Sequence, residues 1–351
     1  MDYITVKGYK SFKDLSLKLN KINLLIGSNG SGKSNFLSLF ELLGNAYEQR
    51  LGFYVAQMGG VDKVLHQGRK VTDTISINVG QKNNNYVLTL MESDGRLIVE
   101  QESLGYHQSF EDITTFGNET SLKYYDGLRR GDYIKEYISQ IKKFHFHDTG
   151  RTSPFTSESH IVNDSYQLYA HGENIASLLY RILQAKPLVY KRIRSIIQSI
   201  APYFNDFYFN ISEAGTVRLQ WQDKYSEMIY GPSDLSDGTI RFIALTVLFM
   251  QPWLPKVIII DEPELGLHPV AIDKLAGLIN IAAQQGTQVI IATQSAELIS
   301  KFQPEDVLTV NQIHGATEIK RLSSAELKNW LDDYTLGDLW KQNIMKGGQP
   351  V

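Results

Sequence analysis

The segment Gly27–Ser34, with the sequence GSNGSGKS, constrains this chain more than any other and fits the pattern G-x-x-x-x-G-K-S/T in full. The apolar run Ile22–Ile26 precedes it, and apolar residues at helical spacing follow it through Leu43. Strand, glycine-rich loop and helix in this order predict a phosphate-binding loop, because glycines let backbone N–H groups turn toward phosphate oxygens at a helix N-terminus. A glycine-rich turn that matches by accident is the alternative, and the flanking strand and helix disfavour it.

The residue types in this loop predict how a nucleotide would be held. Lys33 is expected to reach the β- and γ-phosphates, and Ser34 is expected to bind Mg²⁺. ATP and Mg²⁺ are therefore the expected cofactors. The full set of expected nucleotide-binding residues in the loop is Asn29, Gly30, Ser31, Gly32, Lys33 and Ser34.

The rest of the chain has the pattern of an α/β fold. From residue 235 onward helices and strands alternate, which predicts a parallel sheet. Residues 71–105 instead alternate with a period of two between turn residues, which predicts an antiparallel meander. We therefore expect a P-loop NTPase fold with a mixed central sheet, an antiparallel β subdomain and an inserted helical lobe. The expected division is a head formed by 1–110 and 206–351, with the mainly helical lobe at 111–205.

Length and composition limit the classes of protein to consider. A chain of 351 residues allows about two domains, or one large domain with an insertion. Lys and Arg number 35 against 38 Asp and Glu, a net charge of −3, so any contact with nucleic acid must be a local patch. The absence of cysteine excludes disulfides, Cys-zinc sites and thiol catalysis, and it suits a cytoplasmic location. We expect no export signal and no membrane span, because the apolar runs fall far short of roughly 20 residues.

The run Val257–Ile260 predicts a buried parallel strand, and two acids follow it directly. Asp261 would emerge at the C-terminal end of this strand, where it could bind Mg²⁺ through water. Glu262 beside it could act as the general base toward an attacking water. Alone, the segment could equally be a core strand that ends in two solvated acids. Beside a complete phosphate loop, the catalytic interpretation is favoured.

A third motif, Leu235–Thr239 (LSDGT), precedes an expected helix and resembles the LSGGQ signature of ABC-type ATPases, in the variant found in RecF-like and SMC-like heads. Further segments resemble the same group in the same order. They are the opening Tyr9–Phe12 (YKSF), the Walker B and D-loop run Glu262–Pro269 (EPELGLHP), the switch-loop segment Thr293–Ser295 (TQS), and the tail Leu336–Trp340 (LGDLW) with Gly347 and Gly348 after it. The resemblance covers both ends of the chain and is loose over about 110–205.

The resemblance implies two heads that sandwich two ATP molecules. Ser236 and Gly238 would then contact the γ-phosphate bound by the other subunit's loop, whereas read alone they are a capped helix start. Gln294 stands where many ABC-type ATPases have a catalytic histidine. Its amide can donate a hydrogen bond but carries no charge, so slower or differently regulated hydrolysis is expected. Gln57 is the candidate Q-loop residue and metal contact, on position alone.

Two other features have ordinary explanations beside functional ones. His145 and His147, with Asp148 after them, suggest a metal site, but no completing ligand is evident and a structured edge of the inserted lobe is favoured. The segment Asn174–Pro202 could follow a phosphate backbone, or it could be an amphipathic helix with a basic polar face. The segment contains no acidic residue, and its five basic residues are Arg181, Lys186, Lys191, Arg192 and Arg194.

These observations predict an ATP-hydrolysing head of the RecF-like/SMC-like ABC type without a long coiled coil. The resemblance implies an ATP-dependent homodimer that works as a DNA-linked clamp or sensor in repair, recombination or anti-phage defence. Any cutting would come from a partner effector such as a nuclease, since the chain shows no nuclease constellation of its own. Two alternatives stay open: the ATPase subunit of a membrane transporter, and a nucleotide-sensing scaffold in which hydrolysis is only a timer.

Overall fold

The computed structural model describes residues 1–345 except 108, 116 and 128–129. The chain forms two compact units. Unit 1 comprises Met1–Ile141 and Gln303–Val351, and unit 2 comprises Lys142–Phe302. The expected partition into a head and an inserted lobe has other boundaries and stays a prediction.

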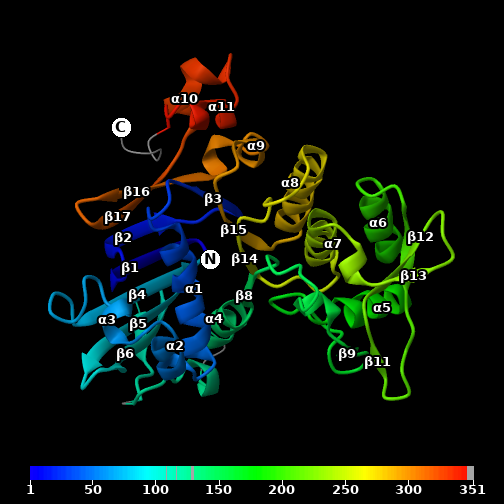
Figure 1. Ribbon diagram of the computed structural model, residues 1–351. Helices are drawn as coiled ribbons and strands as arrows, with labels where there is room; N and C mark the ends of the chain where they lie inside the picture. Colours follow the sequence, from blue (N-terminus) through cyan, green and yellow to red (C-terminus); the bar gives the residue numbers. More distant parts are fainter. Residues whose placement is uncertain (108, 116, 128–129, 346–351) are drawn as a thin grey trace. The chain divides into compact units, whose positions relative to one another are not determined.

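Unit 1 contains an antiparallel sheet with the strand order β2-β1-β4-β5-β6-β7. Figure 1 labels β1, β2, β4, β5 and β6 of this sheet. Alternating apolar residues form its buried face, and Ile4 lies opposite Val79 in the β1/β4 register. The meander expected over 71–105 is thereby confirmed. The strands are β1 (Tyr3–Tyr9), β2 (Phe12–Lys18), β4 (Thr74–Gln81), β5 (Asn84–Ser93), β6 (Arg96–Tyr106) and β7 (Ser109–Asp112).

A second group of strands in unit 1 carries the glycine-rich loop. β3 (Ile22–Ile26) is buried along its whole length and pairs in parallel with β16 (Val307–Ile313), which pairs antiparallel with β17 (Ala316–Arg321). The mixed pairing matches the expected mixed sheet. The helices of unit 1 are α1 (Lys33–Tyr47), α2 (Leu51–Gln57), α3 (Val61–Val64), α4 (Arg130–Ser139), α10 (Ser324–Leu331) and α11 (Leu336–Lys341). Gly347 and Gly348 of the expected tail motif lie outside the described residues.

Unit 2 contains a parallel strand pair with helices around it. β14 (Val257–Asp261) pairs in register with β15 (Gln288–Thr293), and the aliphatic residues of both strands are buried, as two-sided burial of parallel strands requires. The helices are α5 (Ile175–Ala185), α6 (Pro187–Gln198), α7 (Asp237–Met250), α8 (Pro269–Gln284) and α9 (Ala296–Ile299). Two smaller sheets, β10-β12-β13 and β9-β11, consist of β9 (Ser159–His160), β10 (Phe204–Tyr208), β11 (Thr216–Val217), β12 (Gln220–Asp223) and β13 (Ile229–Tyr230). Among the described helices, none combines the length and the apolar character needed to cross a membrane.

Candidate nucleotide-binding and catalytic residues

The glycine-rich loop of unit 1 depends on backbone conformations that only glycine adopts easily. Gly30 has φ +77° and Gly32 has φ +112°, and α1 begins immediately afterwards at Lys33. A Cβ on Gly32 would lie 2.2 Å from Oγ1 of Thr317 on β17. The same hydroxyl donates to the carbonyl of Ser31 at 2.9 Å. Thr317 of β17 therefore holds the glycine-rich loop in place directly before the N-terminus of α1.

The side chains of this loop fit a phosphate ligand. Lys33 is only 7% exposed, and its ammonium donates to the carbonyls of Gly27 at 2.7 Å and Ser28 at 3.0 Å. The Ser31 hydroxyl is buried and has no hydrogen-bond partner among the described residues, so a phosphate oxygen would satisfy it. Ser34 is exposed at the start of α1. The loop thus offers a buried cation, an unsatisfied hydroxyl and an accessible hydroxyl for a cation.

In unit 2, the structure brings the expected base and the expected switch residue together. β14 ends at Asp261, and Glu262 follows with φ +43°, a left-handed conformation that is rare for a residue with a side chain. The Glu262 N–H donates to the carbonyl of Ala292 on β15 at 2.8 Å. Gln294 Nε2 donates to Glu262 Oε1 at 3.0 Å. The Glu262 carboxylate is thereby oriented by a neutral amide donor.

Glu264 is a buried acid in the same loop that the sequence motifs do not single out. The Thr293 hydroxyl donates to Glu264 Oε1, and the Ser295 N–H donates to that hydroxyl at 3.0 Å. Glu264 Oε2 is buried without a partner within the described part of the chain. Burial raises the pKa of this carboxyl above its ordinary value, against the hydrogen bond from Thr293, which lowers it. Glu264 therefore links the loop after β14 to the switch segment.

The signature turn has a structural explanation as well as a functional one. Ser236 is the N-cap of α7, where its Oγ accepts the Thr239 N–H at 3.2 Å. Gly238 is required by packing, since a Cβ there would lie 2.5 Å from the carbonyl oxygen of Gly266. Both residues also line a groove of about 750 Å³, together with Gly266 and His268. The capped helix start is thus present, and it faces an open groove.

Gln57, the proposed Q-loop residue, is the last residue of α2 in unit 1 and is exposed. The next residue is Met58, and its Sδ accepts a hydrogen bond at 3.5 Å from the ammonium of Lys10 in the YKSF opening. This contact relates α2 to the opening segment and leaves the metal role of Gln57 a prediction.

The histidines lie beyond the strand that precedes them, because β8 (Ile141–Phe144) ends one residue earlier. The rings of His145 and His147 are 4.4 Å apart between centroids, and burial lowers the pKa of His145. Over the residues that the structure describes, no group of three or more His, Cys, Asp or Glu side chains is arranged to hold a metal ion. His147 Nε2 instead forms a hydrogen bond with the main-chain carbonyl of Asp261 at 3.1 Å, an interaction that no sequence motif predicts.

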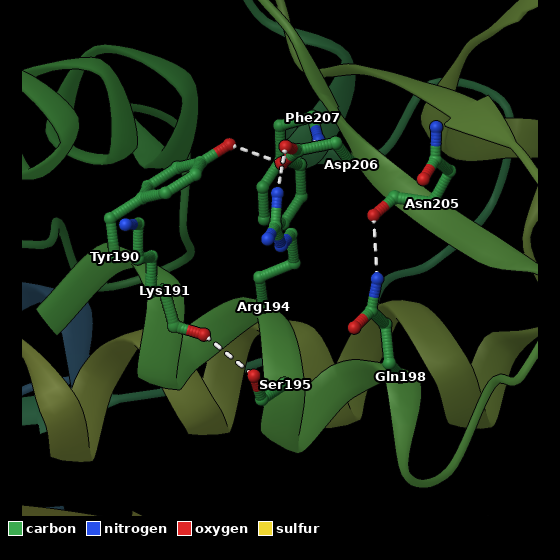
Figure 2. Close-up of polar contacts among 8 residues, drawn as sticks. All are labelled: Tyr190, Lys191, Arg194, Ser195, Gln198, Asn205, Asp206 and Phe207. Atoms are coloured by element: carbon green, nitrogen blue, oxygen red, sulfur yellow. Dashed lines mark hydrogen bonds and ion pairs between the residues drawn. The ribbon is translucent and has the colours of Figure 1, made fainter. Parts of the chain in front are cut away.

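The basic stretch in unit 2 is partly used in packing. Arg194 and Tyr190 of α6 both donate to the Asp206 carboxylate, each at 2.6 Å. Figure 2 shows these two contacts. Arg181 stacks its guanidinium on the ring of Tyr166, at 3.8 Å from the centroid. Lys186, Lys191 and Arg192 are exposed. Two of the five basic residues therefore stabilise the fold, and three form the remaining candidate surface.

Arg241 is the second functional candidate that the sequence motifs do not single out. It is buried on α7, and it donates hydrogen bonds to the main-chain carbonyls of Phe146, His147 and Leu265. The signal in the sequence is its position, since Arg241 is the one charged residue in the run Ile240–Met250, five residues after Ser236.

Comparison with known families gives a match over most of the chain. The model of a family described as an AAA domain, putative AbiEii toxin, type IV TA system, matches residues 22–300. That range includes the glycine-rich loop, the signature turn and β14 with its acids.

Similarity to curated relatives is confined to part of each chain. The energy-coupling factor transporter ATP-binding protein EcfA2 of Lactobacillus delbrueckii subsp. bulgaricus is 29% identical over 140 residues, which is 38% of this chain and 47% of that protein. EcfA2 of Latilactobacillus sakei subsp. sakei is 34% identical over 82 residues, 23% of this chain and 27% of that protein. The matched region therefore spans less than half the length of either relative.

Solved structures match over nearly the whole chain at low identity. An Smc head bound to the C-winged helix domain of ScpA has a TM-score of 0.58 and 15% identity, and the match covers 93% of this chain and 99% of that one. An Smc head with an extended coiled coil, bound to the C-terminal domain of ScpA derived from Pyrococcus furiosus, has a TM-score of 0.56 and 12% identity, covering 95% and 98%. This likeness concerns the fold alone, and it confirms the expected α/β class with mixed sheets.

Proposed function

The chain belongs to the AAA-domain family whose model covers residues 22–300, and from this premise we propose that it binds and hydrolyses ATP with the help of Mg²⁺. The observation that carries the proposal is the hydrogen bond from Gln294 to Glu262, because it holds a carboxylate in a defined orientation at the end of a buried parallel strand. Ligands of α/β sheets bind beyond the C-terminal ends of such strands.

Phosphate binding falls to the loop Gly27–Ser34 in this proposal. Its backbone N–H groups and the Lys33 ammonium would bind the β- and γ-phosphates. Lys33 is already held inside the loop by two carbonyls, which limits the side-chain entropy lost on binding. Ser34 and Asp261 would hold Mg²⁺, which when bound offsets the negative charge of the phosphates. Gln57 is a further candidate ligand of the metal.

Proton removal falls to Glu262. As general base it would accept a proton from the water that attacks the γ-phosphate. Gln294 supplies one N–H to Oε1 and no formal charge. A histidinium in its place would stabilise the carboxylate more strongly and so weaken it as a base. The amide therefore orients Glu262 without placing a charge beside it.

We further propose that two copies act together around ATP. The groove beside Ser236 and Gly238 supports this, because it opens at the N-terminus of the 14-residue helix α7. The positive end of a helix dipole attracts an anionic phosphate. A γ-phosphate held by the loop of a second copy fits the chemistry of this groove. Helix capping and packing alone are the competing explanation of these residues.

The physiological role that we propose is an ATP-gated, DNA-linked clamp or sensor in repair, recombination or anti-phage defence, acting with a partner effector. The likeness to Smc heads supports it through the fold. The curated relatives favour a second candidate, the ATPase subunit of a transporter, through 29–34% identity over limited segments. A nucleotide-timed scaffold is the third candidate.

One experiment separates the DNA-linked clamp from the other two candidates. ATP turnover would be measured on the full chain alone, with double-stranded DNA and with single-stranded DNA at matched ionic strength. Stimulation by DNA, absent in the Glu262→Gln variant, supports the DNA-linked clamp. Turnover that ignores both forms of DNA would contradict it and favour the transporter or scaffold. Absence of turnover in every condition would contradict hydrolysis itself.

A further inference from the structure

Arg241 is a cation buried in an apolar helix, with 7% of its surface exposed. Burying a charge is costly unless hydrogen bonds compensate it. Its Nε donates to the carbonyl of Phe146 at 3.1 Å, its Nη2 to that of His147 at 3.3 Å, and its Nη1 to that of Leu265. An apolar side chain would fill this position without that cost. The planar fork of donors is therefore what distinguishes arginine here.

These hydrogen bonds hold one side of the loop Asp261–Leu265, and His147 holds the other. His147 Nε2 lies 3.1 Å from the Asp261 carbonyl, which can only accept, so this nitrogen carries the proton. Arg241 binds the Leu265 carbonyl and the carbonyl of His147 itself. Between the two supports lies Glu262 with φ +43°. A residue in such a strained conformation persists only when its surroundings impose it.

The first turn of the same helix packs on the same loop. A Cβ on Gly238 would meet the Gly266 carbonyl oxygen at 2.5 Å, and a Cβ on Gly266 would lie 2.9 Å from Arg241 Nη1. The 265–266 backbone is thus in contact with both the signature turn and the Arg241 guanidinium. Because such packed groups are not continuously deformable, displacement of the turn must displace the loop.

We propose that Arg241 is a positioning residue that couples the signature turn Ser236–Gly238 to the loop carrying Glu262. Engagement of the turn by a phosphate bound to the second copy sets the position of α7. The Arg241 guanidinium passes a displacement of α7 to Leu265, and the loop passes it to Glu262. Engagement of the turn then adjusts the position of the loop and, with it, the orientation that Gln294 gives the Glu262 carboxylate. This inference rests on the proposed ATP hydrolysis by Glu262.

The test compares Arg241→Met, which keeps the volume and removes every donor, with Arg241→Lys, which keeps the charge and removes the fork. Lys274→Met, an exposed cation on α8, is the matched control. Turnover is measured under saturating ATP, and ATP affinity is measured separately by calorimetry. We expect Arg241→Met to lower kcat about 10- to 100-fold, as removal of an outer supporting residue commonly does. The dissociation constant for ATP should stay within twofold, and Arg241→Lys should recover part of kcat.

Combining Arg241→Met with Glu262→Gln distinguishes a positioning role of Arg241 from a purely structural one. If Arg241 acts through Glu262, the double variant should be no slower than Glu262→Gln alone. Multiplying losses, or an ATP affinity that falls together with kcat, would overturn the inference. If Arg241→Met does not fold, the same measurements of kcat, ATP affinity and combination with Glu262→Gln are made on Arg241→Lys and on Gly266→Ala, whose added methyl group crowds the guanidinium. Glu262→Gln turning over at the wild-type rate would instead contradict the proposed function.

Discussion

Gln294 donates its side-chain amide to Glu262 Oε1 at 3.0 Å, and the two residues are separated by 32 positions in the chain. The parallel pairing of β14 with β15 accounts for this hydrogen bond, because both residues follow the C-terminal ends of these strands. The pair also defines the chemistry of the proposed site, since a neutral donor fixes a charged base.

Replacing Gln294 by Glu tests this relationship. A second carboxylate 3.0 Å from Glu262 would raise the pKa of the pair, because two like charges cannot both ionise cheaply at that distance. We expect the acid limb of the pH–kcat profile to move to higher pH and turnover at neutral pH to fall by about tenfold. Gln285→Glu adds the same charge at an exposed position and should leave the profile in place. An unshifted acid limb for Gln294→Glu would separate Gln294 from the base.

Glu262→Gln keeps the shape of the side chain and removes the proton acceptor. Turnover should fall by roughly 10²- to 10⁴-fold, the range that loss of a general base commonly costs. ATP should still bind, and the variant should accumulate as a dimer only when ATP and Mg²⁺ are present. Size-exclusion chromatography with light scattering measures this. If Glu262→Gln is slow but stays monomeric, the assignment of Glu262 as the base stands and the dimeric clamp is contradicted. Asp261→Asn should differ from Glu262→Gln, because it should also lose the Mg²⁺-dependent part of its ATP affinity.

Mixing two inactive variants tests whether sites are shared between copies. Lys33→Ala should lose ATP binding, and Ser236→Arg should keep it while a bulky cation blocks the groove. In a heterodimer one site carries both defects and the other carries neither. An equimolar mixture should therefore regain up to about a quarter of the wild-type rate, given random pairing in a symmetric dimer. Heterodimers that form and stay inactive would show that each copy works alone. Lys21→Ala, a change at an exposed position ahead of β3, is the control for Lys33→Ala.

Glu264 predicts a pH-dependent stability. Burial raises the pKa of its carboxyl above the ordinary value of 4.5, so folding favours the protonated form. This contribution is complete below the unfolded pKa and is lost as the pH rises through the folded pKa. Glu264→Gln imitates the protonated form and keeps an acceptor for Thr293. We expect it to match wild type near about pH 4 and to become more stable by about 1 kcal/mol toward neutral pH.

Urea unfolding across this pH range measures the difference. Glu213→Gln, at an exposed position, controls for the loss of one carboxylate and should not reproduce the trend. A Glu264→Gln variant that is less stable than wild type at neutral pH would mean that the ionised carboxylate stabilises the loop.

The basic stretch contains cations that stabilise the fold and cations that are exposed, and Arg194 belongs to the first group. Its ion pair with Asp206, which also accepts from Tyr190, ties α6 to β10 (Figure 2). Arg194→Gln should destabilise the fold by about 1 kcal/mol. Lys191→Gln with Arg192→Gln should change stability by less than about 0.5 kcal/mol and, if DNA binds there, reduce the salt slope of binding by about one for each cation removed from a phosphate. Thermal unfolding and DNA titration at several salt concentrations distinguish the two effects.

Local sequence was sufficient wherever function follows from one contiguous stretch. The loop Gly27–Ser34 could be predicted because its glycines, lysine and hydroxyls act through the backbone of a single strand–loop–helix unit. The buried strand β14 and its two acids followed from an apolar run with polar residues at its end. The meander of β4–β6 followed from its period of two. In each case neighbours in the chain determine the conformation.

Interactions between distant segments could only be found in the tertiary structure. Nothing near Arg194 in the sequence indicates that Asp206 would take its charge, and nothing near His147 indicates the carbonyl of Asp261, 114 residues away. Arg241 could be seen in the sequence as an oddity in an apolar helix, but its partners are carbonyls, which every residue carries and no side chain identifies. Such interactions depend on how strands and helices pack, and packing is a property of the whole unit rather than of any one segment.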